Sequence, residues 1–300
     1  MDTFEQINWP LVRSVARSLY LSFRMLPSSI RMQITLAYLL ARASDTITDI
    51  SLGKEDERLE ALRQLQKIAN DPRAQYDTEI HLALVRLQKK SPERQLLEHL
   101  PILVESLQHQ ADAKEIREVW SSIIEGQIFD LGRRPYSEPL THTQLDRYIF
   151  LVAGCVGKFW TRICHKHIPR FASLSAEYME ELGILYGNGL QLINILRDQD
   201  EDATRGRAYL CAKDAKERFQ EALMAMQSGV KYVAAIHCSS LRYATLLPAL
   251  FGMSTLKLVR SYSGKVKISR REVRYLLIVA LPSLFSAKFA VYLLKHLSLK

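Results

Sequence analysis

Glycine and proline are scarce in this sequence, and long stretches contain neither residue. Only 12 of the 300 residues are glycine and 10 are proline, whereas 48% are hydrophobic. The alternation of apolar and polar residues that marks half-buried strands is also missing, which argues against a sandwich or barrel. A chain of this length and apolar content can bury a large core. The sequence therefore predicts an all-α protein. Since it has no linker or repeat, we expect a single domain that comprises residues 1–300.

Cysteine is also scarce, and the positions of the four cysteines do not suggest a metal site. Cys155, Cys164, Cys211 and Cys238 form no CxxC pair and no cluster with histidine, which argues against a zinc site. They are typical of buried thiols in a reducing compartment. The first twenty residues lack the basic and apolar regions of an export signal. We therefore expect a cytoplasmic protein.

Acidic residues are nearly absent from the C-terminal segment 257–300. It holds ten Lys or Arg and a single acid, Glu272, so the whole net charge of +9 lies there. The basic cluster Lys265–Arg274 precedes an apolar run, Tyr275–Ala287, that Pro282 interrupts. A bilayer span needs about 20 apolar residues. A span, a core helix and an interfacial helix over residues 275–297 all stay open, and the basic cluster favours a membrane surface. Nucleic acid is a poorer partner because no aromatic residues interleave with the charges.

Apolar periodicity, breakers and capping signals predict the helices. Thr141 or Thr143 is expected to cap the helix that begins near residue 142. The predicted helices cover residues 10–24, 29–50, 55–70, 77–89, 93–109, 113–131, 142–165, 175–200, 212–226, 230–246, 253–262 and 269–297.

Polar side chains recur at helical spacing inside an apolar stretch, "QLINILRDQDEDATRGRAYL", residues 191–210. Gln191, Asn194, Asp198 and Asp202 are three, four and four residues apart, which places them on one face of a helix. Two carboxylates at this spacing repel each other by about 0.2–0.5 kcal/mol. The leucines and isoleucines between them indicate that the stripe faces inward or into a cleft. We therefore expect a cation at this stripe.

A second stripe of the same kind occurs in "YLLARASDTITD", residues 38–49. Tyr38, Arg42, Asp45 and Asp49 are four, three and four residues apart on another predicted helix. Aspartate oxygens are hard ligands suited to Mg²⁺, which takes one or two carboxylates plus substrate phosphates. Arginines close to both stripes can bind phosphate oxygens. One such pair is common on solvated helices, but two pairs in apolar surroundings predict a Mg²⁺ site for a phosphorylated substrate.

These motifs resemble those of the squalene/phytoene synthase family, the all-α enzymes that join two isoprenoid diphosphates head to head. "ARSLYLSFRMLP" looks like the family's amino-terminal SRSF segment, and "YLLARASDTITD" is similar to its first aspartate motif. "YIFLVAGCVGKFWTRIC" resembles the VAG and VG signature, and "GNGLQLINILRDQDEDATRGRAYL" resembles the second aspartate motif. "EGQIFDLGRR" and "KISRREV" resemble further family segments. The resemblance covers most of the chain and implies a helical bundle around a central apolar cleft.

The resemblance also implies a role for each matching residue. Those implied to hold Mg²⁺ are Asp45, Asp49, Asn194, Asp198 and Asp202. Those implied to bind the diphosphates are Arg17, Ser18, Arg42 and Arg207. Those implied to line the cleft near the reacting carbons are Tyr38, Tyr148, Gln191 and Tyr209. The chain departs from the family pattern at Thr48, often Glu, and at Cys211, commonly Pro, but neither change removes a group with an implied role.

The implied reaction joins two molecules of farnesyl diphosphate into presqualene diphosphate and then ends in one of two ways. Hydride from NADPH would give squalene, whereas proton loss without NADPH would give a dehydrosqualene- or phytoene-like polyene. Thr46 after the first aspartate and the segment "VGKFWTRI" look more squalene-like. The favoured expectation is therefore a squalene synthase that uses Mg²⁺ and NADPH and is peripherally associated with a membrane.

Two other classes of protein fit the sequence less well. A terpene cyclase would carry a DDxxD motif, which is absent. A non-catalytic helical protein at a membrane surface would explain the basic C-terminal segment but not the two aspartate stripes. The segment "GNGLQL" lacks the third glycine and the preceding strand of a Rossmann turn, so it gives no evidence for a dinucleotide fold.

Overall fold

The computed structural model describes residues 8–16, 19–50, 54–74, 77–89, 91–133, 138–261, 264 and 266–298. These described residues form helices and no β-strand, apart from one antiparallel bridge between Ala172 and Ile236. The predicted all-α fold is confirmed. The chain divides into two compact units, one of Met1–Tyr20 and Ser28–Arg133 and one of Leu21–Pro27 and Arg134–Lys300. The expectation of a single domain stays a prediction.

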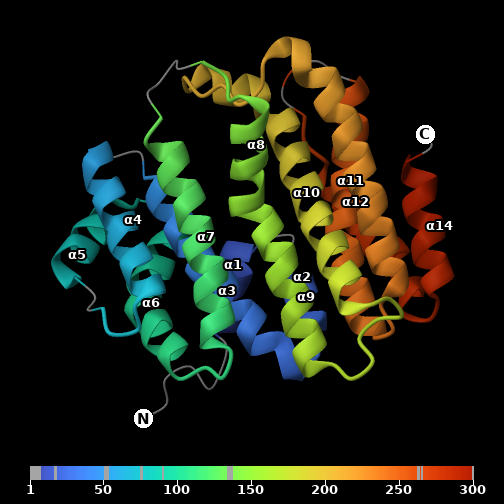
Figure 1. Cartoon of the computed structure of the whole chain (residues 1–300), viewed down its shortest axis with the longest axis horizontal. Helices are drawn as coiled ribbons and strands as arrows, with labels where there is room; N and C mark the ends of the chain where they lie inside the picture. Colours follow the sequence, from blue (N-terminus) through green and yellow to red (C-terminus); the bar gives the residue numbers. More distant parts are fainter. Residues whose placement is uncertain are drawn as a thin grey trace. The chain divides into compact units, whose positions relative to one another are not determined.

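The first unit is built around α3, against which α4, α6 and α7 pack (Figure 1). Its described helices are α1 (Trp9–Ala16), α3 (Ser28–Thr48), α4 (Glu55–Asn70), α5 (Thr78–Leu87), α6 (Ser91–Gln108) and α7 (Ala113–Leu131). Leu36 and Leu39 of α3 and Trp120 of α7 are fully buried. Each buried side chain of this size contributes about 1.5–3 kcal/mol to folding. The apolar side of α3 is thus the core of this unit.

The second unit is built around α10, which packs against α9, α11 and α12 (Figure 1). The α-helices described in it are α2 (Tyr20–Met25, whose first residue belongs to the other unit), α8 (His142–Ile149), α9 (Cys155–His167), α10 (Ala176–Thr204), α11 (Ala215–Ala235), α12 (Ser239–Ser261), α13 (Arg270–Val279) and α14 (Ala287–Ser298). A π-helical segment, η2 (Phe150–Gly154), joins α8 to α9, and short 3-10 turns form η3 (Ala212–Asp214) and η4 (Leu281–Leu284). Tyr186 of α10 is buried, and its hydroxyl donates to the carbonyl of Thr245 at 2.9 Å.

Side-chain caps fix the starts of several helices. Thr141 and Gln144 form a reciprocal capping box at α8, with N···O distances of 3.3 and 3.0 Å. Thr141, not Thr143, is therefore the cap. Ser175 accepts from the backbone of α10 and Ser269 from that of α13. Each cap of this type contributes about 1 kcal/mol.

Several predicted helix boundaries are wrong. The helix predicted over 10–24 is two helices, α1 and α2, and the helix predicted over 142–165 contains the π-helical segment η2. The three helices predicted over 212–226, 230–246 and 253–262 are only two, α11 and α12. Gly229 lies inside α11 and does not end it. A Cβ at this position would stand 2.7 Å from the Tyr186 ring, so the missing side chain makes room for that ring. Pro248 is likewise accommodated inside α12.

The helix predicted over 269–297 is also interrupted. α13 ends at Val279, η4 contains Pro282, and α14 begins only at Ala287. Proline has no backbone N–H to donate and disfavours helical geometry in the residue before it, and the helix does not continue through Pro282. Among the described residues, no helix is both long enough and apolar enough to cross a bilayer.

Candidate active site

The first aspartate stripe lies at the C-terminal end of α3, in the first unit. Tyr38, Arg42 and Asp45 belong to α3, and Asp49 directly follows its last residue. The backbone N–H of Asp49 still donates to the carbonyl of Asp45 at 3.2 Å, so the helical turn continues through it. Arg58 of α4 donates to the carbonyl of Thr48 at 2.8 Å, which holds the end of α3 in place.

Arg42 binds the first carboxylate of this stripe. Its Nη1 donates to Oδ2 of Asp45, and its Nη2 lies 3.5 Å from Oε1 of Glu93 on α6. Burial lowers the pKa of Arg42, but the negative charges of Asp45, Asp49 and Glu93 outweigh that effect and the pKa is raised. A permanently charged guanidinium thus lies beside the aspartates. It provides the fork of donors that phosphate oxygens bind.

The environment of Asp45 disfavours an isolated negative charge. Loss of surrounding water raises the pKa of Asp45, the charge of Asp49 raises it further, and Arg42 lowers it without cancelling these effects. The Asp45 side chain nevertheless stays 43% exposed. A carboxylate that is reachable from solvent and whose surroundings raise its pKa gains from a bound cation, which stabilises the ionised form. The donor set and its electrostatics therefore fit Mg²⁺.

The remaining predicted residues of the first unit lie before and within α3. The Tyr38 hydroxyl donates to the carbonyl of Val15 at 3.1 Å, which ties α3 to the last turn of α1. Arg17 and Ser18, predicted to bind diphosphate, lie outside the described residues.

The second aspartate stripe lies entirely within α10, in the second unit. Gln191, Asn194, Asp198 and Asp202 all fall between Ala176 and Thr204. The Asn194 side chain donates to Oε1 of Gln191 at 3.4 Å, so the two amides are neighbours along the stripe. Asp198 is 36% exposed at its side chain. Its carboxylate is therefore accessible, like that of Asp45.

Arg197 binds Asp198 with two hydrogen bonds. Its Nε donates to Oδ1 at 2.7 Å and its Nη2 donates to Oδ2. These bonds to Asp198 are the main reason why the pKa of Arg197 is raised. Each of the two stripes therefore has its first aspartate bound by an arginine from the same helix. The described residues contain no group of three or more His, Cys, Asp or Glu side chains that could hold a metal ion.

The turn after α10 leads to two more predicted residues, Arg207 and Tyr209. The backbone N–H of Arg207 donates to the carbonyl of Asp202 at 2.8 Å, and Gly206 has the positive φ of 75° that this turn requires. Tyr209 then stacks on Tyr148 of α8, with ring centroids 5.4 Å apart and an interplanar angle of 19°. Both tyrosines are buried. Tyr148 and Tyr209 are thus in contact, and the backbone of Arg207 is bound to the end of the stripe.

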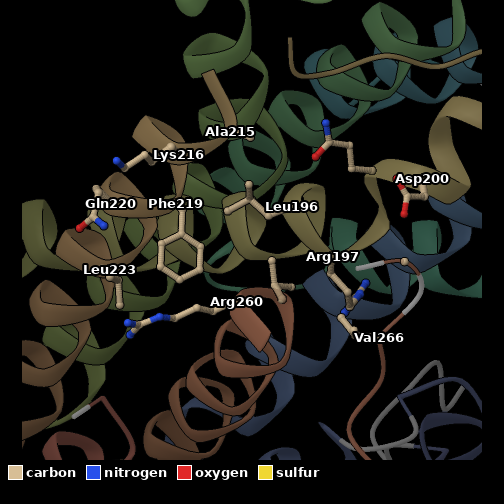
Figure 2. A pocket seen from close by; sticks show the side chains of 13 residues that line it. Leu196, Arg197, Asp200, Ala215, Lys216, Phe219, Gln220, Leu223, Arg260 and Val266 are labelled. Atoms are coloured by element: carbon tan, nitrogen blue, oxygen red, sulfur yellow. The ribbon is translucent and has the colours of Figure 1, made fainter. Parts of the chain in front are cut away.

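A pocket of about 750 Å³ opens on the other side of α10 (Figure 2). At 100° per residue, Leu196 and Asp200 point away from the face that carries Asp198 and Asp202. The pocket is lined by Leu196, Arg197, Gln199, Asp200, Ala215, Lys216, Phe219, Gln220, Leu223, Val259, Arg260, Gly264 and Val266. Figure 2 shows Phe219, Leu223 and Arg260 on one side of it and Arg197 and Asp200 on another.

Sequence reasoning missed this pocket as a whole. Its basic side chains, Arg197, Lys216 and Arg260, come from three different helices and have no common spacing. In the sequence, Arg197 stands out only as one of the arginines close to the second aspartate stripe. It links the two sites, because it binds Asp198 and also lines the pocket. The partner that Arg42 finds in Glu93 is likewise a contact between distant helices without a local signal.

Comparison with known proteins identifies the family of this chain. The family model for squalene/phytoene synthase matches residues 12–221, which contain both aspartate stripes and the Tyr148–Tyr209 stack. The chain belongs to the squalene/phytoene synthase family. Members of this family are head-to-head prenyltransferases, and the prediction of the family from the motifs is confirmed.

Individual relatives include both kinds of enzyme. The squalene synthase of Saccharomyces cerevisiae is 27% identical over 89% of this chain and 65% of its own length. The 15-cis-phytoene synthase of a Synechocystis strain is 30% identical over 72% of this chain and 57% of its own length. A solved dehydrosqualene synthase shares the fold with a TM-score of 0.61 at 20% identity, covering 91% of this chain and 93% of the other. The chain thus spans less than two thirds of the length of these two sequence relatives.

Proposed function

We propose that this chain is a squalene synthase, which condenses two farnesyl diphosphates to presqualene diphosphate and reduces that intermediate to squalene. The observation that carries the proposal is the repeated arrangement of an aspartate pair with an arginine bound to its first carboxylate, once on α3 and once on α10. Membership of a family of prenyltransferases, which typically use Mg²⁺, supports the same reading.

The aspartates are the residues proposed to hold Mg²⁺. Asp45 and Asp49 supply the ligands from the first unit, and Asp198, Asp202 and Asn194 supply those from the second. Two carboxylates leave coordination positions for phosphate oxygens, which is the arrangement that Mg²⁺ adopts in phosphoryl sites. Bound there, Mg²⁺ would neutralise the leaving diphosphate.

The arginines and tyrosines have complementary proposed roles. Arg42 and Arg207 bind diphosphate oxygens and withdraw charge from the breaking C–O bond, because a fixed guanidinium needs no reorganisation during the reaction. The buried stack of Tyr148 and Tyr209 presents aromatic surface and excludes water from the allylic cation. An aromatic face stabilises such a cation by about 0.5–2 kcal/mol. Tyr38 in the first unit and Gln191 in the second are each proposed to lie near the reacting carbons.

The pocket beside α10 supports the reductive ending. Its volume is that of a small-molecule site, and its three basic side chains, Arg197, Lys216 and Arg260, outnumber its acidic one, Asp200, so it carries positive charge of the kind that binds phosphate groups. Because the pocket lies on the side of α10 away from Asp198 and Asp202, its basic side chains are proposed to hold the phosphates of NADPH, and its nicotinamide, the source of the hydride, would extend around α10 toward the reacting carbons. The similarity to a squalene synthase also extends over 89% of this chain, beyond the segment shared with the phytoene synthase.

A second candidate function is a dehydrosqualene or phytoene synthase that needs no NADPH. It is favoured by the 30% identity to a phytoene synthase and by the shared fold of a dehydrosqualene synthase. In that case the same aspartates and arginines serve the condensation, and the final cation loses a proton.

The place of action is proposed to be the cytoplasmic side of a membrane, reached by peripheral association through the segment 257–300. This segment carries the whole net positive charge of the chain, and anionic lipid attracts such segments. Squalene is a hydrocarbon, so release at a bilayer gives the product an apolar phase to enter. Lys265, at the start of the predicted basic cluster, lies outside the described residues.

The test of the reaction is a direct assay. Purified protein is incubated with farnesyl diphosphate and Mg²⁺, with and without NADPH, and the extracted lipids are identified by mass spectrometry. We expect presqualene diphosphate without NADPH and squalene with it. Absence of any C30 product when Mg²⁺ and farnesyl diphosphate are both present would contradict the proposed condensation.

A further inference from the structure

The outer side of the α13–η4 segment is unusually apolar for an exposed surface. Tyr275 is 62% exposed, Ile278 65%, Leu281 45% and Phe285 90%. We call these four side chains the apolar ridge. Single exposed apolar residues are ordinary, but four large ones close together in one short segment indicate an interaction site. Within α13 only Leu276 is buried, so this helix contributes little to the core.

Basic side chains flank the ridge at both ends. Arg271 and Arg274 are exposed on α13 before it, and Lys288 is exposed on α14 after it. Glu272 is the single acid in the whole segment 257–300. A surface with apolar side chains between cations matches the boundary of an anionic bilayer, where acyl chains lie beneath negative headgroups.

The ridge is held outward by two neighbouring residues of α12. Arg242 is buried, and its Nε donates to the carbonyl of Ser283 at 2.9 Å while its Nη1 donates to that of Ile236 at 2.9 Å. The hydroxyl of Tyr243 donates to the carbonyl of Leu277 at 2.9 Å. Ser283 itself is fully buried. The inner side of the segment is therefore fastened to α12, and the side chains on its outer side stay exposed.

The following helix is occupied on its inner side. Ala290, Leu293 and Leu294 of α14 are buried, and α14 packs against α11 and α12 (Figure 1). Its apolar face is part of the core and is not free to enter a membrane. Apart from Tyr292 of α14, which is 61% exposed, the exposed large apolar side chains of this region lie on α13, on η4 and at the turn that contains Phe285. A helix as short as α13, about 15 Å long at 1.5 Å per residue, suits the plane of the interface.

We propose that the apolar ridge is a monotopic membrane-docking surface for bilayers that contain anionic phospholipid. Ile278, Leu281 and Phe285 enter the boundary between headgroups and acyl chains, and Arg271, Arg274 and Lys288 bind the phosphates above it. The inference specifies the surface for the peripheral association proposed above and rests on that proposal. It differs from the single helix predicted over residues 269–297, for which core, interfacial and spanning positions stayed open, because the docking element is the interrupted α13–η4 segment fastened to α12.

The test is vesicle co-sedimentation with the full chain. Vesicles of phosphatidylcholine, with and without phosphatidylglycerol, are mixed with wild type, with the double variant Ile278→Ser/Phe285→Ser and with Arg271→Glu/Arg274→Glu. Met224→Ser on α11 is the matched control, because Met224 is 58% exposed but lies outside the ridge. We expect the partition coefficient of the serine variant to be about tenfold or more lower than that of wild type on both kinds of vesicle. The charge variant should bind vesicles with and without phosphatidylglycerol equally well. The control should bind as wild type does.

Two further readouts separate this inference from its alternatives. Turnover of farnesyl diphosphate in detergent should be the same in the serine variant, the charge variant and wild type. If wild type binds vesicles but forms no condensation product, the proposed function is contradicted and the docking surface is not. Partitioning that is unchanged in the serine variant would overturn the docking surface. If wild type does not bind vesicles and sediments as a dimer, whereas the serine variant sediments as a monomer, the ridge is an interface between copies of this chain. The membrane proposal is then wrong.

Discussion

Asp45 and Asp198 are each bound by an arginine of their own helix, and this pairing has a consequence for stability. Arg42 is three residues before Asp45, and Arg197 immediately precedes Asp198. Both aspartate side chains are partly exposed, at 43% and 36%. Ion pairs with this exposure contribute about 0–1 kcal/mol to folding. The pairs therefore have little structural value, which is consistent with a role in binding a ligand.

Replacing either aspartate with asparagine should separate function from stability. Asp45→Asn or Asp198→Asn should lower turnover by about 100- to 1000-fold, the usual loss when one electrostatic contact to a transition state is removed. The free energy of unfolding should change by less than about 1 kcal/mol, because the lost ion pair is exposed and repulsion between the aspartates is relieved. Steady-state assays at saturating Mg²⁺ and urea denaturation measure the two quantities.

Glu105→Gln on α6 and Glu217→Gln on α11 are matched controls for charge removal, since both glutamates are exposed. They should keep wild-type turnover. Retention of more than about a tenth of the activity in either aspartate variant would refute its assignment as a metal ligand.

The residue roles differ in how far the sequence could predict them. The spacing of Asp45 and Asp49, and of Asp198 and Asp202, follows directly from the 3.6-residue period, so both stripes were predictable. Glu93 contacts Arg42 from α6, and Lys216 and Arg260 meet at a pocket from α11 and α12. Contacts of this kind depend on how helices pack, and no local pattern in one sequence encodes them.

At the scale of elements, the glycines of the VAG and VG signature set the distance between α9 and α10. A Cβ at Gly157 would lie 1.9 Å from the carbonyl oxygen of Gly183. The two backbones touch there, so no side chain fits at either position. The π-helical segment η2 precedes this contact and also packs against α10. Since α10 carries the second aspartate stripe, the close contact determines how that stripe is presented.

Gly157→Ala should therefore be strongly destabilising. We expect a loss of more than about 3 kcal/mol, above the usual range for overpacking, because the added methyl meets backbone and not a movable side chain. Gly252→Ala on α12 is the matched control. Its Cβ would meet the end of the Leu190 side chain at 3.0 Å, and the gain of about 1 kcal/mol in helix propensity offsets that contact. Urea denaturation monitored by circular dichroism compares the two, and equal stabilities would contradict a backbone contact at Gly157.

Helix boundaries show where sequence patterns lose their predictive value. Gly229 and Pro248 look like breakers, yet both lie inside helices. Gly229 is required because the ring of Tyr186, a residue 43 positions earlier, occupies the space beside it. Pro282, by contrast, does interrupt its helix. The helix propensity of a residue is a local property, but whether a glycine or proline ends a helix also depends on tertiary packing.

At the scale of the whole molecule, charge is distributed by function. The first 256 residues carry equal numbers of acidic and basic residues, and the excess of nine positive charges lies in the last 44. The part of the chain with the aspartate stripes is thus neutral, while the C-terminal part combines the apolar ridge with cations. This division was visible in the sequence, because charge can be counted without a structure. The pocket could not be seen, because it forms only where α10, α11 and α12 meet.

The pocket makes a prediction about the two halves of the reaction. Lys216→Gln should raise the KM for NADPH about tenfold, the loss expected for one charge-assisted contact, and should leave the rate of presqualene diphosphate formation unchanged. Lys216 lines the pocket but belongs to neither aspartate stripe. Lys231→Gln on the same helix α11 is the matched control, since Lys231 is exposed and does not line the pocket.

Assays with deuterium-labelled NADPH should show one deuterium transferred to squalene by wild type and by both variants at saturating cofactor. A KM for NADPH that is equal in the two variants would move the cofactor site elsewhere. A conjugated triene formed at the same rate with and without NADPH would instead establish the dehydrosqualene or phytoene synthase reading, with the aspartates and arginines retaining their proposed roles.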